Sequence, residues 1–424
     1  MFGVASEKDV TQFNEAEVQK LIIRPLGQAK KCQFCFALLF DNERNGLCCN
    51  NGLITSPKTK DVEKKWWEIA HLPEPPKLLK NLFARTNLDP DVYHDREFIS
   101  RSRGYNNLFS MASIGIDEEI FQKSGWSPNV KICGKIYHYT GSILPEEGEK
   151  PVYAQIITLD NDLQELERRL EVSGKSNVNK ETMEKLQAEL HRINPFYKDY
   201  KAISELDPKM IEDKLIVLQA DKEPKLPKPV GDHTRQWNLP SCNEIAFLDI
   251  SPDATTKSDI IIRLKGGGCQ RISERNRCYM PLHFVLLFPM GTEGWHVGLW
   301  MTDKDGTKSH RKISPAMFTR YRMMERTRHE NSNERLFNSV TRGARLFQEY
   351  LCSAYYVEQK MKMDWVENNQ KAIKAEKYAG LLDAQSTGDG LANIGEKITI
   401  LPPSIQGTPR WYTESFQGKN LARN

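Results

Sequence analysis

The sequence lacks any long apolar run. Its longest strongly apolar stretch, FVLLFPM, covers only Phe284–Met290, whereas a membrane-spanning helix needs about 20 apolar residues. The first ten residues, MFGVASEKDV, also lack the basic start and the apolar segment of a secretory signal. We therefore expect a nuclear or cytoplasmic protein without a signal peptide or a transmembrane segment.

A strong net charge is also missing. The 424 residues include 60 Lys and Arg against 56 Asp and Glu, which leaves a formal net charge of +4. This balance is too mild to indicate a nucleic-acid partner. Whether such a partner is expected therefore depends on how the charges are distributed along the chain. The apolar share of 39% and the charged share of 27% are those of a globular protein, and the length allows two or three domains.

No complete nucleotide-binding loop is present. Gly174, Lys175 and Ser176 form the end of such a loop. Its first glycine should lie five residues before Gly174, where the chain has Arg169. Because the backbone needs both glycines to wrap around a phosphate, we predict no nucleotide site in this chain.

The nine cysteines are an odd number in a chain without a secretory signal, which favours reduced thiols or a metal site over disulfides. Cys32 and Cys35 form a CxxC pair, and Cys48 and Cys49 follow after twelve residues. Two thiolate pairs at this spacing can close a tetrahedron around one zinc ion. Adjacent side chains rarely point at one ion, so His71 is an alternative fourth ligand; four buried free thiols are the alternative to any metal. We predict a structural zinc ion held by the four cysteines.

The apolar patterns predict an α+β, multi-domain protein with a zinc-finger-like module, a middle region of β-hairpins and helices, and a helical C-terminal region. The expected segments are an N-terminal lead at 1–30, the cysteine module at 31–60, a mixed α/β region at 61–160, a helical region at 161–220, a linker at 221–240, a β-rich region at 241–310, a helical domain start at 320–417 and a tail at 418–424.

Two hairpins are predicted in the middle of the chain. NVKICGKIYHYTG and VYAQIITL, within residues 129–159, have the residue types of two strands joined by a long connection. SDIIIRLK and CQRIS flank three successive glycines, which favour a turn between two paired strands. The apolar segment that follows, PLHFVLLF at 281–288, is expected to be buried.

Helices are predicted on both sides of this β-rich region. The pattern over residues 162–206 is helical, with Asn179 as a cap and with Leu163 and Leu166 on an apolar face. A second long helical pattern runs over residues 334–385. Its expected features are a capping box formed by Asn331 and Glu334, a close packing contact at Gly343, and a second helix that begins at Trp365.

The C-terminal region begins with a basic segment. Residues 311–345 carry nine Lys or Arg against three Glu. Such an excess can neutralise the phosphates of a nucleic acid, although a solvated helical face is the plain alternative. The candidate nucleic-acid-binding residues are Arg320, Arg322, Arg326, Arg328, Arg335, Arg342, Arg345 and Arg410.

Several segments, in this order along the chain, resemble the Helitron transposases of eukaryotic rolling-circle transposons. CQFCFALLFDNERNGLCC resembles their zinc-finger-like cysteine motif. IIIRLKGGGCQRISERNRCYMPLHFVLLFPMGTEGWH resembles the region that follows. RLFQEYLCSAYYVEQKMKMDWVENNQ and ILPPSIQGTPRWYTESFQ resemble the opening of the Helitron helicase-like N-terminal domain. The resemblance implies a DNA-facing role for the basic segment, with single-stranded or transposon-end DNA as the partner.

The catalytic motifs that the resemblance implies are absent from this sequence. A replication-initiator nuclease of this family carries two histidines separated by one residue, to hold a metal ion, and tyrosines four residues apart as nucleophiles. The nine histidines here include no such pair, and no two of the fourteen tyrosines are four apart. We therefore expect a truncated Helitron-like transposase that binds DNA and has no catalytic residue of its own.

Two alternatives remain open at this stage. The chain is part of an active rolling-circle transposase, a DNA-nicking endonuclease with an ATP-dependent helicase, whose catalytic part lies elsewhere; or it is a transposon remnant or a host-recruited interaction module. The sequence indicates no particular protein partner.

Overall fold

The computed structural model describes residues 30–40, 43–54, 69, 71–84, 88–116, 136–140, 145, 148–159, 161–173, 178–204, 215–218, 245–248, 260–262, 270–303, 307–332 and 334–370. The chain divides into two compact units, Met1–Leu351 and Cys352–Asn424. The predicted linker at 221–240, the tail at 418–424 and Arg410 lie outside the described residues.

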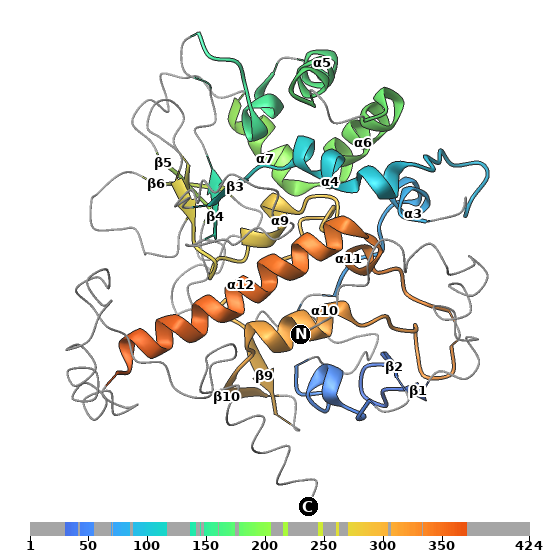
Figure 1. Ribbon diagram of the computed structural model, residues 1–424, viewed down its shortest axis with the longest axis vertical. Coiled ribbons are helices and arrows are strands. Elements are labelled where there is room, and N and C mark those ends of the chain that lie inside the picture. Colours follow the sequence, from blue (N-terminus) through green and yellow to red (C-terminus); the bar gives the residue numbers. More distant parts are fainter. Residues whose placement is uncertain are drawn as a thin grey trace, which may run out of the picture. The chain divides into compact units, whose positions relative to one another are not determined.

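The described residues form helices and small antiparallel sheets, which confirms the predicted α+β class (Figure 1). The helical elements are η2 (Leu47–Cys49), α3 (Lys77–Leu82), α4 (Phe98–Phe109), η3 (Tyr153–Thr158), α5 (Asp162–Ser173), α6 (Lys180–Ile193), α7 (Pro195–Ser204), α9 (Tyr279–His283), α10 (Pro315–Met323), α11 (Ser339–Arg342) and α12 (Arg345–Asn368). The strands are β1 (Lys30–Lys31), β2 (Leu38–Leu39), β3 (Ser113–Ile116), β4 (Ile136–Thr140), β5 (Leu215–Leu218), β6 (Ile245–Leu248), β7 (Ile260–Ile262), β8 (Gln270–Ile272), β9 (Trp300–Thr302) and β10 (Lys308–Lys312).

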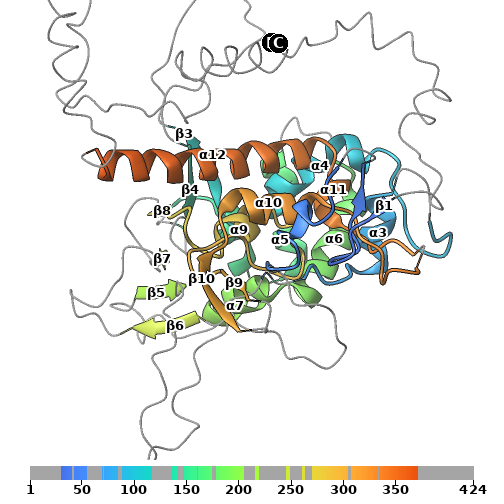
Figure 2. The ribbon, with the colours of Figure 1, turned by 90° about the horizontal axis from the view of Figure 1, so that it is seen from below.

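The strands make four small sheets, and every pairing among them is antiparallel. Two are pairs, β1 with β2 and β9 with β10. A three-stranded sheet has the order β3-β4-β8, in which His138 of β4 lies opposite Ile114 on one side and Ile272 on the other. The other has the order β6-β5-β7, and Figure 2 shows β5 and β6 running in opposite directions.

Both predicted hairpins are wrong in their partners. VYAQIITL does not pair with β4; residues 153–158 form the short helix η3, which begins at Tyr153 with φ of 49° and packs against α7. CQRIS is a strand, β8, but it pairs with β4, while β7 pairs with β5. Sequence alternation indicates which residues suit a strand, whereas the choice of partner depends on contacts far along the chain.

Helices α5, α6 and α7 confirm the helical prediction for residues 162–206. The cap is as predicted, because the Asn179 side chain accepts hydrogen bonds from the backbone N–H groups of the first turn of α6. The predicted apolar face of α5 needs a correction: Leu163 is 69% exposed, and the buried face carries Leu166 together with Glu165 and Arg169.

The core of the first unit contains the apolar segment at residues 284–288, whose five side chains are fully buried, as predicted. The Asn106 side chain of α4 holds this segment, since it donates to the His283 carbonyl (2.8 Å) and accepts from the Leu286 N–H (3.2 Å). Gly343 approaches it closely: a Cβ at that position would lie 2.7 Å from Leu287 Cδ2. The predicted packing role of Gly343 is therefore confirmed.

His283 is a core histidine with satisfied partners. Its Nδ1 lies 2.9 Å from the Ala112 carbonyl, and its Nε2 lies 3.7 Å from Glu349 Oε1. Arg103 Nε donates to the other Glu349 oxygen at 2.6 Å. Burial raises the pKa of Glu349, but the hydrogen bonds from His283 and Arg103 together outweigh burial and leave the pKa below its ordinary value.

The helical prediction at the C-terminal end needs two corrections. Residues 334–337 are not helical, and the helix cap is Asn338, whose side chain accepts from the Val340 N–H at the start of α11. No second helix begins at Trp365, which lies inside the continuous helix α12. Among the described residues, no helix is both long and apolar enough to cross a membrane.

Candidate functional site

The first cysteine pair lies on the tight turn between β1 and β2. The Cys32 N–H donates to the Ala37 carbonyl (2.8 Å), and the Phe36 N–H donates back to the Cys32 carbonyl (2.9 Å). Phe36 adopts the left-handed region, with φ of 56°. This turn brings the side chains of Cys32 and Cys35 into one buried group.

The second pair lies on η2, between two left-handed corners. Gly46 precedes it with φ of 83°, and a Cβ there would lie 1.9 Å from Asn51 Oδ1. Asn50, Asn51 and Gly52 follow it, all with positive φ. The Gly52 N–H donates to Cys49 Sγ at 3.3 Å, a contact that stabilises thiolate character. The reversal of the chain on both sides of η2 lets two adjacent cysteines reach one group.

The four sulfur atoms have the spacing of a tetrahedral metal site. Cys32 Sγ lies 3.7 Å from Cys49 Sγ, and Cys35 Sγ lies 3.4 Å from Cys48 Sγ. All four lie within 4.8 Å of one another and are buried. Zinc–sulfur bonds of about 2.3 Å in a tetrahedron place sulfur atoms roughly 3.8 Å apart, far beyond a disulfide bond of about 2.05 Å. The cluster can therefore hold a metal ion, and its donor set fits zinc.

His71 does not belong to this cluster. Its Nδ1 lies 3.2 Å from the Tyr321 hydroxyl, in a different contact. His71 is therefore not the fourth ligand, because Cys48 and Cys49 both belong to the cluster.

The electrostatics of the cluster favour a thiolate. Hydrogen bonds from the thiols of Cys48 and Cys49 lower the pKa of Cys35 to about 2, and the charge of Arg326 acts in the same direction. The hydrogen bond to Cys35 raises the pKa of Cys49 to about 12. Because metal ligation requires thiolates, a divalent cation that binds this cluster would release the protons of the remaining thiols.

The cysteine module, defined here as residues 30–54, binds the turn at residues 325–335, almost 300 residues further along the chain. The Leu38 N–H donates to the Glu325 carbonyl (2.8 Å), and the Thr327 N–H donates to the Phe36 carbonyl (3.1 Å). Lys31 Nζ donates to two carbonyls of the same turn, those of Glu330 (2.8 Å) and Ser332 (2.9 Å). The cysteine module and the turn at 325–335, which belongs to the basic segment, thus lie side by side in the fold (Figure 1).

The candidate arginines do not share one helix face. Arg320 and Arg322 lie on α10, Arg342 ends α11, and Arg345 begins α12. The others lie on the turn of 325–335, where Thr327 and Arg335 form a β-bridge. Arg328, Arg335, Arg342 and Arg345 are exposed, and Arg320 and Arg326 are half-buried.

Arg322 lies inside the protein, with 2% of its surface exposed. Its guanidinium carbon lies 4.9 Å from the centre of the Phe318 ring, and its Nη2 donates to the Glu293 carbonyl (3.4 Å). Burial lowers its pKa to about 10. Arg322 is therefore a core residue, although it lies in a basic run of the sequence. Nothing in the neighbouring sequence indicated that its side chain would be buried.

Three of the exposed arginines already pair with glutamates. Arg328 makes a bidentate contact with Glu334: its Nε donates to Oε2 at 2.9 Å and its Nη2 donates to Oε1 at 2.8 Å. Arg335 and Arg342 share the carboxylate of Glu325, at 3.1 and 3.4 Å. One carboxylate therefore balances two guanidinium groups, and a positive excess remains at the surface.

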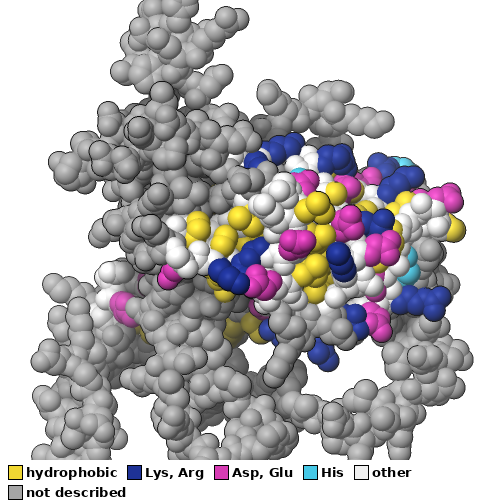
Figure 3. Space-filling view, turned by 90° about the horizontal axis from the view of Figure 1, so that it is seen from above, with side chains coloured by type: hydrophobic (Ala, Val, Ile, Leu, Met, Phe, Trp, Pro, Cys, Tyr) yellow, Lys and Arg dark blue, Asp and Glu magenta, His cyan; other side chains and the backbone are white. Residues whose placement is uncertain are grey.

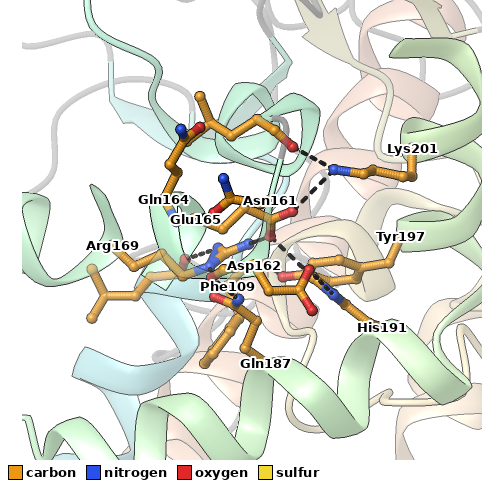
Figure 4. A network of polar contacts seen from close by, with 12 residues as sticks. Phe109, Asn161, Asp162, Gln164, Glu165, Arg169, Gln187, His191, Tyr197 and Lys201 are labelled. Atoms are coloured by element: carbon orange, nitrogen blue, oxygen red, sulfur yellow. Dashed lines mark hydrogen bonds and ion pairs between the residues drawn. The ribbon is translucent and has the colours of Figure 1, made fainter. Parts of the chain in front are cut away.

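A second group of possible metal ligands lies on α5 and α6: Asp162, Glu165 and His191. Figure 4 shows Lys201 and Arg169 converging on Glu165 as well. Their Nζ and Nη2 atoms lie 3.5 and 3.4 Å from its two oxygens. Because these cations already balance the one buried carboxylate, a divalent ion would add charge that nothing compensates, and we interpret this group as structural.

The face drawn in Figure 3 carries basic, acidic and apolar side chains side by side. Over the described residues of that face, side chains of one charge do not gather into a patch. The described residues of this face therefore show no concentration of positive charge like the one that the arginines form around Glu325.

Residues 318–420 match the family model described as "Helitron helicase-like domain at N-terminus". The chain carries a Helitron helicase-like domain. This match confirms the resemblance for the C-terminal quarter of the chain and suggests a transposon-related protein. No curated protein matches the chain.

The matched residues include the candidate arginines from Arg320 to Arg345. The cysteine module lies far outside their limits in sequence but is hydrogen-bonded to them in space. Lys31, whose ammonium group holds the turn at 325–335, was not recognised from the sequence, since no local pattern indicates a contact across that separation.

Proposed function

We propose that this protein binds DNA as the DNA-contacting part of a Helitron-like transposase, with single-stranded or transposon-end DNA as its partner. The observation that supports this most directly is the contact between the cysteine module and the turn at 325–335. A zinc ion in the module would stiffen the turn, and the turn presents arginines to solvent. Guanidinium groups held on a fixed backbone lose less conformational entropy on binding than free side chains do.

The proposed contact surface consists of Arg328, Arg335, Arg342 and Arg345. Glu334 is exposed, and an exposed ion pair such as that between Arg328 and Glu334 stabilises a protein by less than about 1 kcal/mol. Glu325 is half-buried, but Arg335 and Arg342 share its one carboxylate, so a phosphate can act as a further partner of these two exposed guanidinium groups. Release of counterions from DNA supplies the driving force.

We assign no catalytic residue in this proposal. The sequence contains no His-x-His pair, and its Gly174-Lys175-Ser176 fragment lacks the first glycine of a nucleotide loop. The purified chain is accordingly expected neither to nick single-stranded DNA nor to hydrolyse ATP. Activity that follows the pure protein would contradict this part of the proposal.

The test is fluorescence anisotropy with a labelled single-stranded oligonucleotide at several salt concentrations. The wild-type affinity should fall with salt, and the double variant Arg335→Gln/Arg342→Gln should reduce the slope by about 1.4, roughly 0.7 for each lost phosphate contact. Glu325→Gln should raise the affinity, because it releases both guanidinium groups.

Arg192→Gln is the matched control. Arg192 is an exposed arginine paired with Glu189 on α6, outside the Helitron helicase-like domain. It should leave both the affinity and the slope unchanged. Binding that ignores salt, or an equal loss in the Arg192 variant, would remove the DNA-binding proposal.

A further inference from the structure

A hollow lies between the end of α10, residues 336–338 and the segment around His71. Its lining has two arginines, Arg322 and Arg326, four apolar residues, a histidine, a tyrosine and an asparagine. Among the described residues that line it, none is an aspartate or a glutamate. Two positive charges in a lining that contains no acidic side chain make the hollow suited to an anion.

The Arg326 guanidinium is held flat against one wall. Its central carbon lies 3.7 Å from the centre of the Tyr321 ring, and its Nη1 donates to the Met324 carbonyl at 3.0 Å. Its Nε and Nη2 are buried and have no hydrogen-bond partner within the described part of the chain. Buried donors without a partner are rare in folded proteins and call for an acceptor.

Arg322 adds a second charge at the same place. Its side chain is almost completely buried, and its Nε likewise has no partner within the described residues. Burial lowers its pKa to about 10, so it remains protonated at neutral pH. Two arginines that line one hollow thus carry three guanidinium nitrogen atoms without a hydrogen-bond partner among the described residues.

The other polar groups of the lining hold the walls in place. The Asn338 amide donates to the Arg322 carbonyl (2.8 Å) and accepts from the Val340 N–H (3.1 Å), which joins the end of α10 to α11. The Tyr321 hydroxyl contacts His71 Nδ1. Because these contacts fix the backbone on both sides, the arginine donors are positioned before any ligand arrives.

We propose that this hollow binds a phosphate group, which the fork of Arg326 holds with the charge of Arg322 behind it. The inference rests on the proposed DNA binding for the origin of the phosphate, and it names a site separate from the exposed arginines. A guanidinium fork matches two oxygens of a phosphate. The phosphate is either the terminal monoester of a strand or a phosphodiester within it.

The experiment uses the full chain with three probes: inorganic phosphate, and an oligo-dT strand with either a 5′-phosphate or a 5′-hydroxyl. Inorganic phosphate should raise the melting temperature of the wild type and of Arg192→Gln but not of Arg326→Gln. Arg192→Gln is the control because this exposed arginine pairs with Glu189 on α6 and belongs neither to the lining of the hollow nor to the proposed contact surface. An equal phosphate effect in all three proteins, or none in the wild type, would overturn the proposal.

The two oligonucleotides separate the sources of the phosphate. A preference of the wild type for the 5′-phosphate that Arg326→Gln loses assigns the terminal monoester. If both strands bind the wild type equally and Arg326→Gln weakens both by about tenfold or more, as for a lost charge-assisted pair, the hollow takes a phosphodiester. Arg326→Gln binding both strands as well as Arg192→Gln does would refute the site.

The result also separates this site from the DNA-binding proposal. If no DNA binds but the phosphate effect depends on Arg326, the hollow stands and the DNA function fails. If DNA binds and Arg326→Gln responds to phosphate and to both strands as Arg192→Gln does, the DNA function stands and the hollow fails. Zinc content is measured in every variant, because the charge of Arg326 also acts on Cys35. Arg326→Lys is the second variant: it keeps the charge but loses the fork, and a wild-type response to phosphate in this variant would contradict the proposed geometry.

Discussion

Removal of zinc should release the turn that carries the basic residues, not only the cysteine module. The module holds the turn at 325–335 by four hydrogen bonds: two from the backbone of Leu38 and Thr327, and two from Lys31 Nζ. A hydrogen bond contributes about 0.5–1.5 kcal/mol net, so the four together stabilise the docked turn by roughly 2–6 kcal/mol. Structural zinc sites contribute about 10–16 kcal/mol to folding, far more than this small module can replace.

The assay is hydrogen exchange measured by mass spectrometry, with and without a zinc chelator. Peptides that cover 31–40 and 325–336 should lose protection together, by a factor between roughly 30 and 20,000, since every 1.4 kcal/mol corresponds to tenfold. The lower end is expected, because the turn keeps internal bonds such as that from the Leu336 N–H to the Arg326 carbonyl. A peptide from α6 serves as the internal control and should not change.

Cys35→Ser should reproduce the effect of the chelator. Cys352→Ser is the matched control, because Cys352 is exposed and lies outside the cluster. Protection of 325–336 that survives while 31–40 opens would refute the coupling. Metal-free protein with a protected module would refute the zinc site itself.

Two further substitutions test the core. Glu165→Gln leaves Arg169 and Lys201 without their buried counter-charge, so urea unfolding should show that the free energy of unfolding falls by about 3–5 kcal/mol. Replacing both Glu165 and Arg169 with apolar residues should lower it clearly less than the single change, and an equal or larger loss would contradict the charge argument. Gly343→Ala should cost about 1–3 kcal/mol through overpacking, because its Cβ would lie 2.7 Å from Leu287 Cδ2; a melting temperature equal to that of the wild type would mean that Leu287 moves aside freely.

Short-range features could be predicted from the sequence because a few neighbouring residues encode them. The spacing of Cys32, Cys35, Cys48 and Cys49 predicted one metal site, and the four sulfur atoms do lie together. Periodicity located the helices at 162–206, and Asn179 was recognised as a cap since capping depends on a side chain and the next turn. The Helitron helicase-like domain was identified by order and composition over a long segment.

Only the tertiary structure decided which distant elements meet. Strand alternation could not choose β8 as the partner of β4, and a basic run could not reveal that Arg322 is buried while Arg328 is exposed. Two of the four hydrogen bonds that dock the cysteine module onto the turn at 325–335 join backbone groups, which every sequence shares. The hollow beside it is lined by side chains that only the fold brings together. Backbone donors and acceptors carry no sequence signal, so their pairing follows from the packing of the whole fold.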